Sequence, residues 1–437
     1  QTKARGSLGG RGMVRADAPG PALGGRHPAL ERRARDVLAH VRATEAGQAR
    51  RIGVSNYLRG LVRGTLMAKG LEGADILVLP FGSVPLMTFL PDGDNDLAVC
   101  LPAGLPSRPY IDKVIEALEE EQGKVVPGLF PVQDVTVVNA EVQVVKCLVD
   151  GMMFDLSFNT LGGLRTLTFL EELDRRIGRE HFLKNSIILV KAWCYYEGRL
   201  LGAHHGLIST YALEVLVLMF INLHHDQVST PLQVLHGVLR HYAKFPFDDF
   251  CISIQGPIPL GSFPDPDLPA APGGPAPLLA DGVLGELVAK YGPRGGGDTK
   301  RFGVKFFNVM DPLSKTNNLG RSVSRASLQR IRMAFTLAAN KLDAISTLSA
   351  ADEAGAVAGL TQFFQNTLRS IVCSRTMSFD AAGLAPPGIE PAAALLGPPH
   401  VGNGNGAGPR RPRPAGLGDL SPLAAALAGD SEGEEGR

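Results

Sequence analysis

Two aspartates, two positions apart, open a predicted strand in the first third of the chain. They are Asp94 and Asp96 of the run LPFGSVPLMTFLPDGDNDLAVC, which spans residues 79–100. Alternate residues of a strand project from the same face, so both carboxylates point the same way. Neighbouring carboxylates repel each other, and hard divalent cations such as Mg²⁺ relieve that repulsion while they also bind phosphate oxygens. The pair therefore predicts a metal site that handles phosphate.

A Gly-Ser turn and a third acid extend this pattern. Gly82 and Ser83 follow a predicted strand, residues 75–79. Glycine lets a phosphate approach the backbone, and a short helix beginning at Ser83 would offer free N–H groups to an anion. About 60 residues after the acid pair, Asp155 lies in the run MMFDLSFN, on the opposite face from Phe154. A carboxylate in such an apolar strand is expected to be paired or metal-bound.

The elements around these residues predict a mixed sheet followed by a helical region. Alternating apolar residues indicate strands, and apolar residues at helical spacing indicate helices, with Ser55 as the N-cap of a second helix inside the segment 30–67. The change from sheet to helices falls near residue 165. The expected strands are 75–79, 94–101, 135–149 and 152–158, and the expected helices are 30–67, 110–121, 171–179, 182–199, 209–224 and 231–242.

Composition predicts long segments that cannot build a core. The chain of 437 residues contains 52 Gly and 32 Pro, concentrated in a few stretches. We expect a disordered tail over 1–29, a catalytic domain over 30–164, a helical domain over 165–345, a helical extension over 346–380 and a second disordered tail over 381–437. The segment 261–298 is expected to be a surface insertion with a short helix in its middle.

Charge and cysteine content narrow the class of protein. The net charge is +1, but residues 1–66 hold 13 Lys/Arg against 4 Asp/Glu and residues 300–333 hold 8 against 1, which suggests a surface for a polyanion.

Five widely spaced cysteines argue against a disulfide scaffold and a Cys-rich zinc site. The pairs His204-His205 and His224-His225 lack a third ligand at a suitable spacing and are not expected to bind metal. No apolar run is long enough for a membrane span, and a cytoplasmic or nuclear location is expected.

The motifs taken together resemble the DNA-polymerase-β-like nucleotidyltransferase superfamily. The runs LPDGDNDL, VDGMMFDLSFNTLGGL, LVKAWCYYEGRLLGAHHGLISTYALEVLVL and VMDPLSKTNNLGRSV are similar to those of noncanonical poly(A) polymerases and terminal uridylyltransferases, most of all the plant-type branch. The resemblance covers about 35–340. It implies a two-lobed α+β fold, with a mixed-sheet catalytic domain, a helical poly(A)-polymerase/oligoadenylate-synthetase-like substrate-binding domain, and the nucleotide in the cleft between them.

The resemblance also implies roles for individual residues. Asp94, Asp96 and Asp155 would bind two Mg²⁺ or Mn²⁺ ions. Gly82, Ser83 and Lys191 would hold phosphates. The sugar contact would be Asn159, and Arg321 and Arg325 could contact RNA or simply face solvent. In the motif Ser209-Thr210-Tyr211 the hydroxyls would serve phosphate and the tyrosine ring would stack on the base.

The implied reaction is template-independent addition of nucleotides to an RNA 3′ end. The 3′-hydroxyl would attack the α-phosphate of an NTP while pyrophosphate leaves, with Asp155 helping to lower the pKa of the hydroxyl and the two ions stabilising the attacking and leaving oxygens. The implied partners are the NTP, the RNA 3′ end and proteins that supply RNA specificity. No membrane partner is expected.

Three positions depart from the pattern. Asn95 replaces an apolar residue between the acids, and an unpaired buried amide there would cost about 1–3 kcal/mol. Tyr195 replaces a second phosphate-binding lysine, a role that Arg199 could take over. Asn317 stands where uridylyltransferases carry a uracil-selecting His, which favours ATP over UTP. Two alternatives stay open: a catalytically impaired RNA- or protein-binding relative, and an enzyme that acts on small molecules or makes 2′–5′ oligonucleotides.

Overall fold

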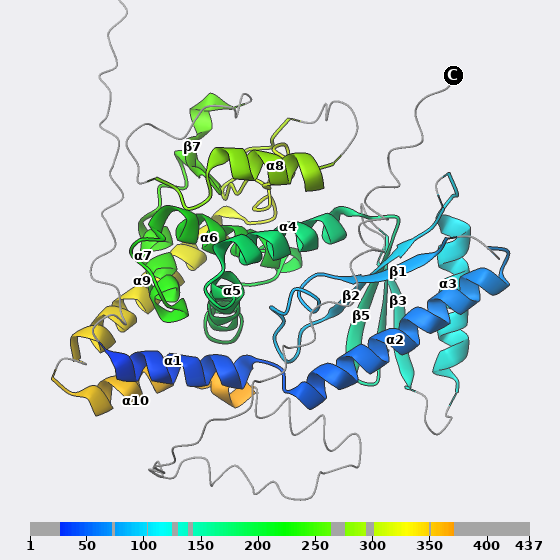
Figure 1. The fold of residues 1–437 in the computed structure, drawn as a ribbon, viewed down its shortest axis with the longest axis horizontal. Helices are drawn as coiled ribbons and strands as arrows, with labels where there is room; N and C mark the ends of the chain where they lie inside the picture. Colours follow the sequence, from blue (N-terminus) through cyan, green and yellow to red (C-terminus); the bar gives the residue numbers. More distant parts are fainter. Residues whose placement is uncertain are drawn as a thin grey trace, which may run out of the picture. The chain divides into compact units, whose positions relative to one another are not determined.

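The computed structural model describes residues 27–71, 75–102, 104–124, 130–138, 143–263, 276–293, 301–348 and 351–370. The chain divides into two compact units (Figure 1). Among the described residues, the sheet unit consists of those within His40–Leu173 and of 366–370. The helical unit consists of 27–39 and of the described residues within Asp174–Gln365.

A mixed five-stranded sheet forms the centre of the sheet unit. Its order is β1-β2-β5-β4-β3, and the only parallel neighbours among these strands are β2 and β5. Asp150 and Gly151 form the two-residue turn that joins β4 to β5. The strands are β1 Leu77–Phe81, β2 Asn95–Cys100, β3 Val132–Val138, β4 Val144–Val149 and β5 Met152–Phe158.

Helices α2 (Glu45–Ala68) and α3 (Arg108–Gln122) pack on one face of this sheet (Figure 1). The buried face of α2 presents Val54, Leu58 and Val62 at helical spacing against the sheet. The expected helix start at Ser55 is wrong. Ser55 lies inside α2, because the apolar spacing continues through it, and the N-cap is Thr44, whose hydroxyl accepts a hydrogen bond from Gly47 N.

The other face of the sheet is the one on which the acids lie. A small cluster of Leu79, Ala98 and Leu164 packs there, with Leu164 on α4 (Gly162–Ile177). A side chain at Gly163 would collide with the ring of Phe81, so this position admits only glycine without rearrangement. Because Ala98 and Asp96 are two apart on β2, Asp96 faces the same side as this cluster.

The helical unit is built around α6, which is apolar on all sides and buried along nearly its whole length. Its N-cap is Ser209, and α7 begins with a capping box formed by Thr230 and Gln233. The elements with most of their residues in this unit are α1 Pro28–Val41, α5 Phe182–Ala192, a π-helical turn Trp193–Glu197, α6 Thr210–His224, α7 Pro231–Lys244, β6 Phe250–Ser253, β7 Gly256–Pro259, α8 Asp281–Tyr291, α9 Arg325–Leu348 and α10 Glu353–Phe363.

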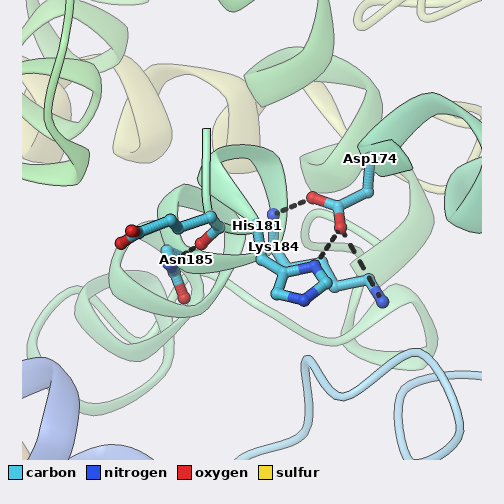
Figure 2. A network of polar contacts seen from close by, with 5 residues as sticks. Asp174, His181, Lys184 and Asn185 are labelled. Carbon is cyan, nitrogen blue, oxygen red and sulfur yellow. Dashed lines mark hydrogen bonds and ion pairs between the residues drawn. The ribbon is translucent and has the colours of Figure 1, made fainter. Parts of the chain in front are cut away.

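A left-handed turn leads into α5. Four consecutive residues, from Gly178 to His181, have φ between 50° and 67°. Asp174 braces this turn (Figure 2): its Oδ1 accepts a hydrogen bond from Lys184 N at 3.2 Å and its Oδ2 lies 2.6 Å from His181 Nδ1. Its carboxylate therefore satisfies one of the free N–H groups at the start of α5.

Several sequence-based expectations fall outside the described residues. These are nearly all of the tail 1–29, the tail 381–437, and the parts 264–275 and 294–298 of the insertion 261–298. The helix expected in the middle of the insertion is present as α8, and its Leu284 and Leu287 are buried. Within the described ranges, no helix has both the length and the apolar character that crossing a membrane requires.

Candidate active site

Asp96 and Asp155 lie side by side on the two parallel strands. The register of β2 and β5 places Asp96 directly opposite Asp155, and residues that are paired in this way have side chains on the same face. Asp94 immediately precedes β2 and is two residues from Asp96. The structure thus brings together the acid pair and the distant third acid, while Phe154 and Leu156 face the core as expected.

The Gly-Ser turn lies against the same acids. Gly82 has φ +74° and follows Phe81, which pairs with Asp96 in the β1–β2 register. A Cβ at Gly82 would collide with Oδ2 of Asp96. The expected helix at Ser83 is a hydrogen-bonded turn instead, in which Thr88 N donates to Ser83 O at 2.9 Å. Glycine is therefore needed both for the backbone conformation and for the space that Asp96 occupies.

The electrostatics of the acids reflect their proximity. Partial burial and the negative charge of Asp155 raise the pKa of Asp94, whereas Lys146 and Arg51 act in the opposite direction. Oδ1 of Asp155 is buried and makes no hydrogen bond within the described chain. A buried carboxylate oxygen without a partner is costly, and it points to a ligand that would satisfy it.

Sequence reasoning missed Lys146, which forms an ion pair with Oδ2 of Asp155. Lys146 lies on β4 directly opposite Asp155. The signal was present in the sequence, because a two-residue Asp-Gly turn fixes hairpin pairing. Counting outward from Asp150-Gly151 pairs Val149 with Met152 and, three positions further, Lys146 with Asp155.

Sequence reasoning also missed Arg51, a buried residue of α2. Its guanidinium donates to the carbonyls of Gly93 and Pro91 at 2.7 and 3.0 Å and to Oδ1 of Asn95 at 3.1 Å. The amide of Asn95 in turn donates to Met153 O at 3.0 Å. The penalty expected from an unpaired Asn95 therefore does not arise, because Asn95 links the strand that follows Asp94 to the strand that carries Asp155.

The side chains of Asp94, Asp96 and Asp155 offer oxygen donors to divalent cations. Their donors are all carboxylate oxygens, the ligands that Mg²⁺ and Mn²⁺ prefer, and Asp155 offers an unsatisfied buried oxygen. Among the described residues, however, no three His, Cys, Asp or Glu side chains already form a metal-binding group. The residues fit the ions in donor type, and the ammonium group of Lys146 holds the remaining oxygen of Asp155.

Asn159 has structural partners in the sheet unit. It follows β5 with φ +51°, its Oδ1 accepts from Leu101 N at 2.8 Å, and its Nδ2 donates to Ser107 Oγ at 3.1 Å. It is exposed. The side chain is thus held in a fixed orientation beside the start of α3, which leaves its role as a sugar contact a prediction.

A second group of predicted residues comes together in the helical unit. The hydroxyl of Tyr211 donates to Oδ1 of Asp311 at 3.0 Å, and the amide of Asn317 donates to Oδ2 of Asp311 at 2.9 Å. Arg321 donates to Oδ1 of Asn317 at 2.9 Å. We call Tyr211, Asp311, Asn317 and Arg321 the Asp311 cluster. Asp311 was not singled out as a site residue from the sequence, although it was part of the Asp-Pro motif.

Lys191, the predicted triphosphate-binding lysine, is nearly buried on α5. Its charge lowers the pKa of Glu214, on α6, but burial has the larger effect and raises that pKa to about 7. Two ionisable groups of opposite sign thus share the interior between neighbouring helices. Glu214 carried no sequence signal beyond being the one charge in an otherwise apolar run.

The remaining predicted residues lie on the surface of the helical unit or at its helix ends. Ser209 caps α6 by accepting from Ala212 N at 3.1 Å, and Thr210 is exposed at the first position of that helix. Arg325 is exposed at the start of α9, and Tyr195 is 43% exposed in the π-helical turn. Thr210, Arg325 and Tyr195 are therefore accessible to solvent, whereas Ser209 is half-buried and its hydroxyl also donates to Leu319 O at 3.4 Å.

Comparison with known proteins identifies the type of fold. Residues 177–368 match the family model of the PAP/OAS1 substrate-binding domain. A histidine-to-asparagine variant of the Cid1 poly(U) polymerase bound to MgATP aligns with a TM-score of 0.52 and 18% identity, over 72% of this chain and 94% of that one. The same enzyme bound to MgGTP gives 0.51 and 18% over the same shares. A structure described as a cytoplasmic RNA terminal U-transferase gives 0.50 and 19%, again over 72% and 94%. No match was found among curated protein sequences.

The chain thus has the two-domain α+β fold of Cid1-like nucleotidyltransferases, and its helical unit matches a PAP/OAS1 substrate-binding domain. This confirms the resemblance and the fold class inferred from the sequence. The assignment to the plant-type branch stays a prediction.

Proposed function

We propose that this protein is a template-independent RNA 3′-nucleotidyltransferase. The observation that carries the proposal is the register that sets Asp96 opposite Asp155, with Asp94 next to them and Gly82 against Asp96. Neighbouring carboxylates on one face of a sheet repel each other, which costs free energy unless a ligand offsets their charge. The arrangement is explained if the acids bind cations together with a phosphorylated substrate.

In this proposal Asp94, Asp96 and Asp155 would hold two Mg²⁺ or Mn²⁺ ions, which would supply positive charge to the attacking and leaving oxygens. Asp155 helps to lower the pKa of the RNA 3′-hydroxyl. The oxygen of that hydroxyl forms the new bond to the α-phosphorus, and the bond to pyrophosphate breaks. Gly82, Ser83 and Lys191 hold the outer phosphates, so the protein contributes positioning and charge without a covalent intermediate.

The Asp311 cluster would read the base. The Tyr211 ring would stack on it, and Asp311 fixes the orientation of the Asn317 amide by accepting from its Nδ2. The free side of Oδ1 of Asn317 can accept a hydrogen bond from the amino group of adenine, which uracil lacks. The MgATP complex of the histidine-to-asparagine Cid1 variant, solved in work on UTP selectivity, is consistent with this assignment. We therefore infer a preference for ATP over UTP.

The test is an extension assay with an oligo(A) primer, Mg²⁺ or Mn²⁺, and each of the four NTPs in turn. We expect extension that is fastest with ATP, and we expect Asn317→His to shift the preference towards UTP. Asp94→Ala/Asp96→Ala should abolish extension. If the parent protein extends no primer with any NTP in either metal, the enzymatic proposal is wrong.

The same assay separates the two alternatives. A binding module would retain nucleotide or RNA without extending the primer, and the double alanine variant would behave like the parent. An enzyme that makes 2′–5′ linkages would give products that resist a 3′–5′-specific nuclease. We expect products that this nuclease degrades completely.

A further inference from the structure

The ammonium group of Lys146 lies beside one of the acids, Asp155. Asp96, Asp155 and Lys146 occupy paired positions on three neighbouring strands, β2, β5 and β4. Paired positions share a face of the sheet, so the ammonium group lies at the end of a row of two carboxylates. The ammonium group pairs with Oδ2 of Asp155, while Oδ1 of the same residue is buried without a partner.

This placement gives Lys146 an electrostatic role. The acids repel each other, and Lys146 is one of two cations, with Arg51, that offset this repulsion at Asp94. Arg51 is fixed by three hydrogen bonds to the loop before β2 and to Asn95. Within the part of the chain that the structure describes, Lys146 pairs with Asp155 alone, and its side chain is 34% exposed, so it can turn towards solvent. Of the two cations, Lys146 is therefore the one that can be displaced.

We propose that Lys146 is a resident counter-cation of the acid cluster and competes with divalent cations for Asp155. The inference rests on the proposed function, because it takes the acids to be the metal ligands. The ammonium group on Oδ2 of Asp155 repels a divalent cation that binds Oδ1, and a cation that also binds Oδ2 must displace it. Both effects lower metal affinity. Lys146 is thus a positioning residue that acts through Asp155, and it sets the metal concentration at which the site fills.

The first experiment measures Mn²⁺ binding by calorimetry without NTP or RNA. The variants are Lys146→Gln, which removes the charge, Lys146→Arg, which keeps it, and Lys124→Gln as a matched control. Lys124 also forms a lysine–carboxylate pair in the sheet unit, with Glu121 at 2.7 Å. We expect Lys146→Gln to lower the Kd for Mn²⁺ by about tenfold, because a unit charge is removed a few ångström from the ion. Lys146→Arg and Lys124→Gln should stay near the parent value.

An unchanged or higher Kd in folded Lys146→Gln would overturn the inference. A Kd that does not change, together with weaker RNA binding, would assign Lys146 to the substrate instead. If the parent extends RNA but the Kd is unchanged, the inference fails and the proposed function stands. If the Kd falls as expected but no NTP is incorporated, the proposed function fails and the competition stands.

A second experiment needs no variant. Acylation of lysines in the parent protein, followed by mass spectrometry, reports how accessible each amine is. Saturating Mg²⁺ should increase the labelling of Lys146 several-fold and leave Lys124 unchanged. Equal labelling of Lys146 with and without Mg²⁺ would contradict displacement even if Lys146→Gln failed to fold.

Discussion

Arg51 and Asn95 form a buried pair that fixes the loop carrying Asp94. Arg51→Met would leave Oδ1 of Asn95 and the carbonyls of Pro91 and Gly93 without this donor. We expect it to lower the free energy of unfolding by about 2 kcal/mol. Asn95→Leu should lower the free energy of unfolding by a similar amount, because Arg51 and Met153 O each lose a hydrogen-bond partner. In urea unfolding, the double variant should lose at least about 0.5 kcal/mol less than the sum of the singles.

Arg63→Met, an exposed change on the same helix, is the control for this cycle and should stay within about 0.5 kcal/mol of the parent. If the two single losses simply add in the double variant, Arg51 and Asn95 do not act as a pair.

Glu214 predicts a pH dependence of stability. Burial raises its pKa to about 7, from an ordinary 4.5. The folded protein then binds a proton more tightly than the unfolded chain. The stabilisation of the folded state by protonated Glu214 is therefore complete below about pH 4.5 and is lost as the pH rises through about 7. The shift corresponds to about 3 kcal/mol. Glu214→Gln cannot titrate, and its stability relative to the parent should improve by about this amount between pH 4.5 and pH 8. A constant difference across this range, measured by denaturant unfolding, would contradict the prediction.

At the scale of elements, the turn after β1 and the hairpin turn after β4 offer a matched pair of glycines. Gly82 and Gly151 have φ of +74° and +71°, but only at Gly82 would a Cβ meet Asp96, since nothing lies within 4 Å of one at Gly151. Both alanine variants should lose about 1 kcal/mol of stability from the backbone strain. Only Gly82→Ala should also lose RNA extension, by about 100-fold or more, because it displaces Asp96, one of the carboxylates that we propose to bind metal.

The comparison is made by primer extension at equal concentrations of folded protein. Equal activity of Gly82→Ala and Gly151→Ala would show that the space beside Asp96 does not matter for the reaction.

The elements also show what the sequence could predict. Strands β1, β2 and β5, helix α7 and the facing of Phe154 against Asp155 follow from local periodicity, because one face of each element is buried, and α6 follows from its long apolar run. The expected single strand 135–149 is wrong, because this segment contains two strands, β3 and β4, which pair antiparallel. The helix start predicted at Ser55 was wrong because serine, a common N-cap residue, also occurs inside helices. Arg51 could not be found from spacing, since its partners are about 40 residues away in the chain and only tertiary packing brings them together. Lys146 could have been found by counting from the hairpin turn.

At the scale of the whole molecule, each unit holds chemistry-bearing side chains of its own. The sheet unit holds the acids with Gly82 and Lys146, and the helical unit holds the Asp311 cluster and Lys191. Part of the basic charge expected to serve a polyanion is used inside the sheet unit instead: Arg50 bonds to Asp150 at 2.8 Å and Arg59 to Val78 O at 2.7 Å. The ion pair with Asp150 offsets the charge of Arg50, and the hydrogen bond to Val78 O fixes the guanidinium of Arg59 in place, so fewer of these cations are free to contact a polyanion than composition suggests.

The proposed activity requires Asp94, Asp96 and Asp155 to bind divalent metal ions. Anomalous diffraction from crystals grown with Mn²⁺ and a non-hydrolysable ATP analogue tests this directly. We predict Mn²⁺ peaks within about 2.5 Å of carboxylate oxygens of Asp94, Asp96 and Asp155, with the Lys146 ammonium group moved away from Asp155. A bound analogue with no Mn²⁺ peak at these three carboxylates would contradict the account.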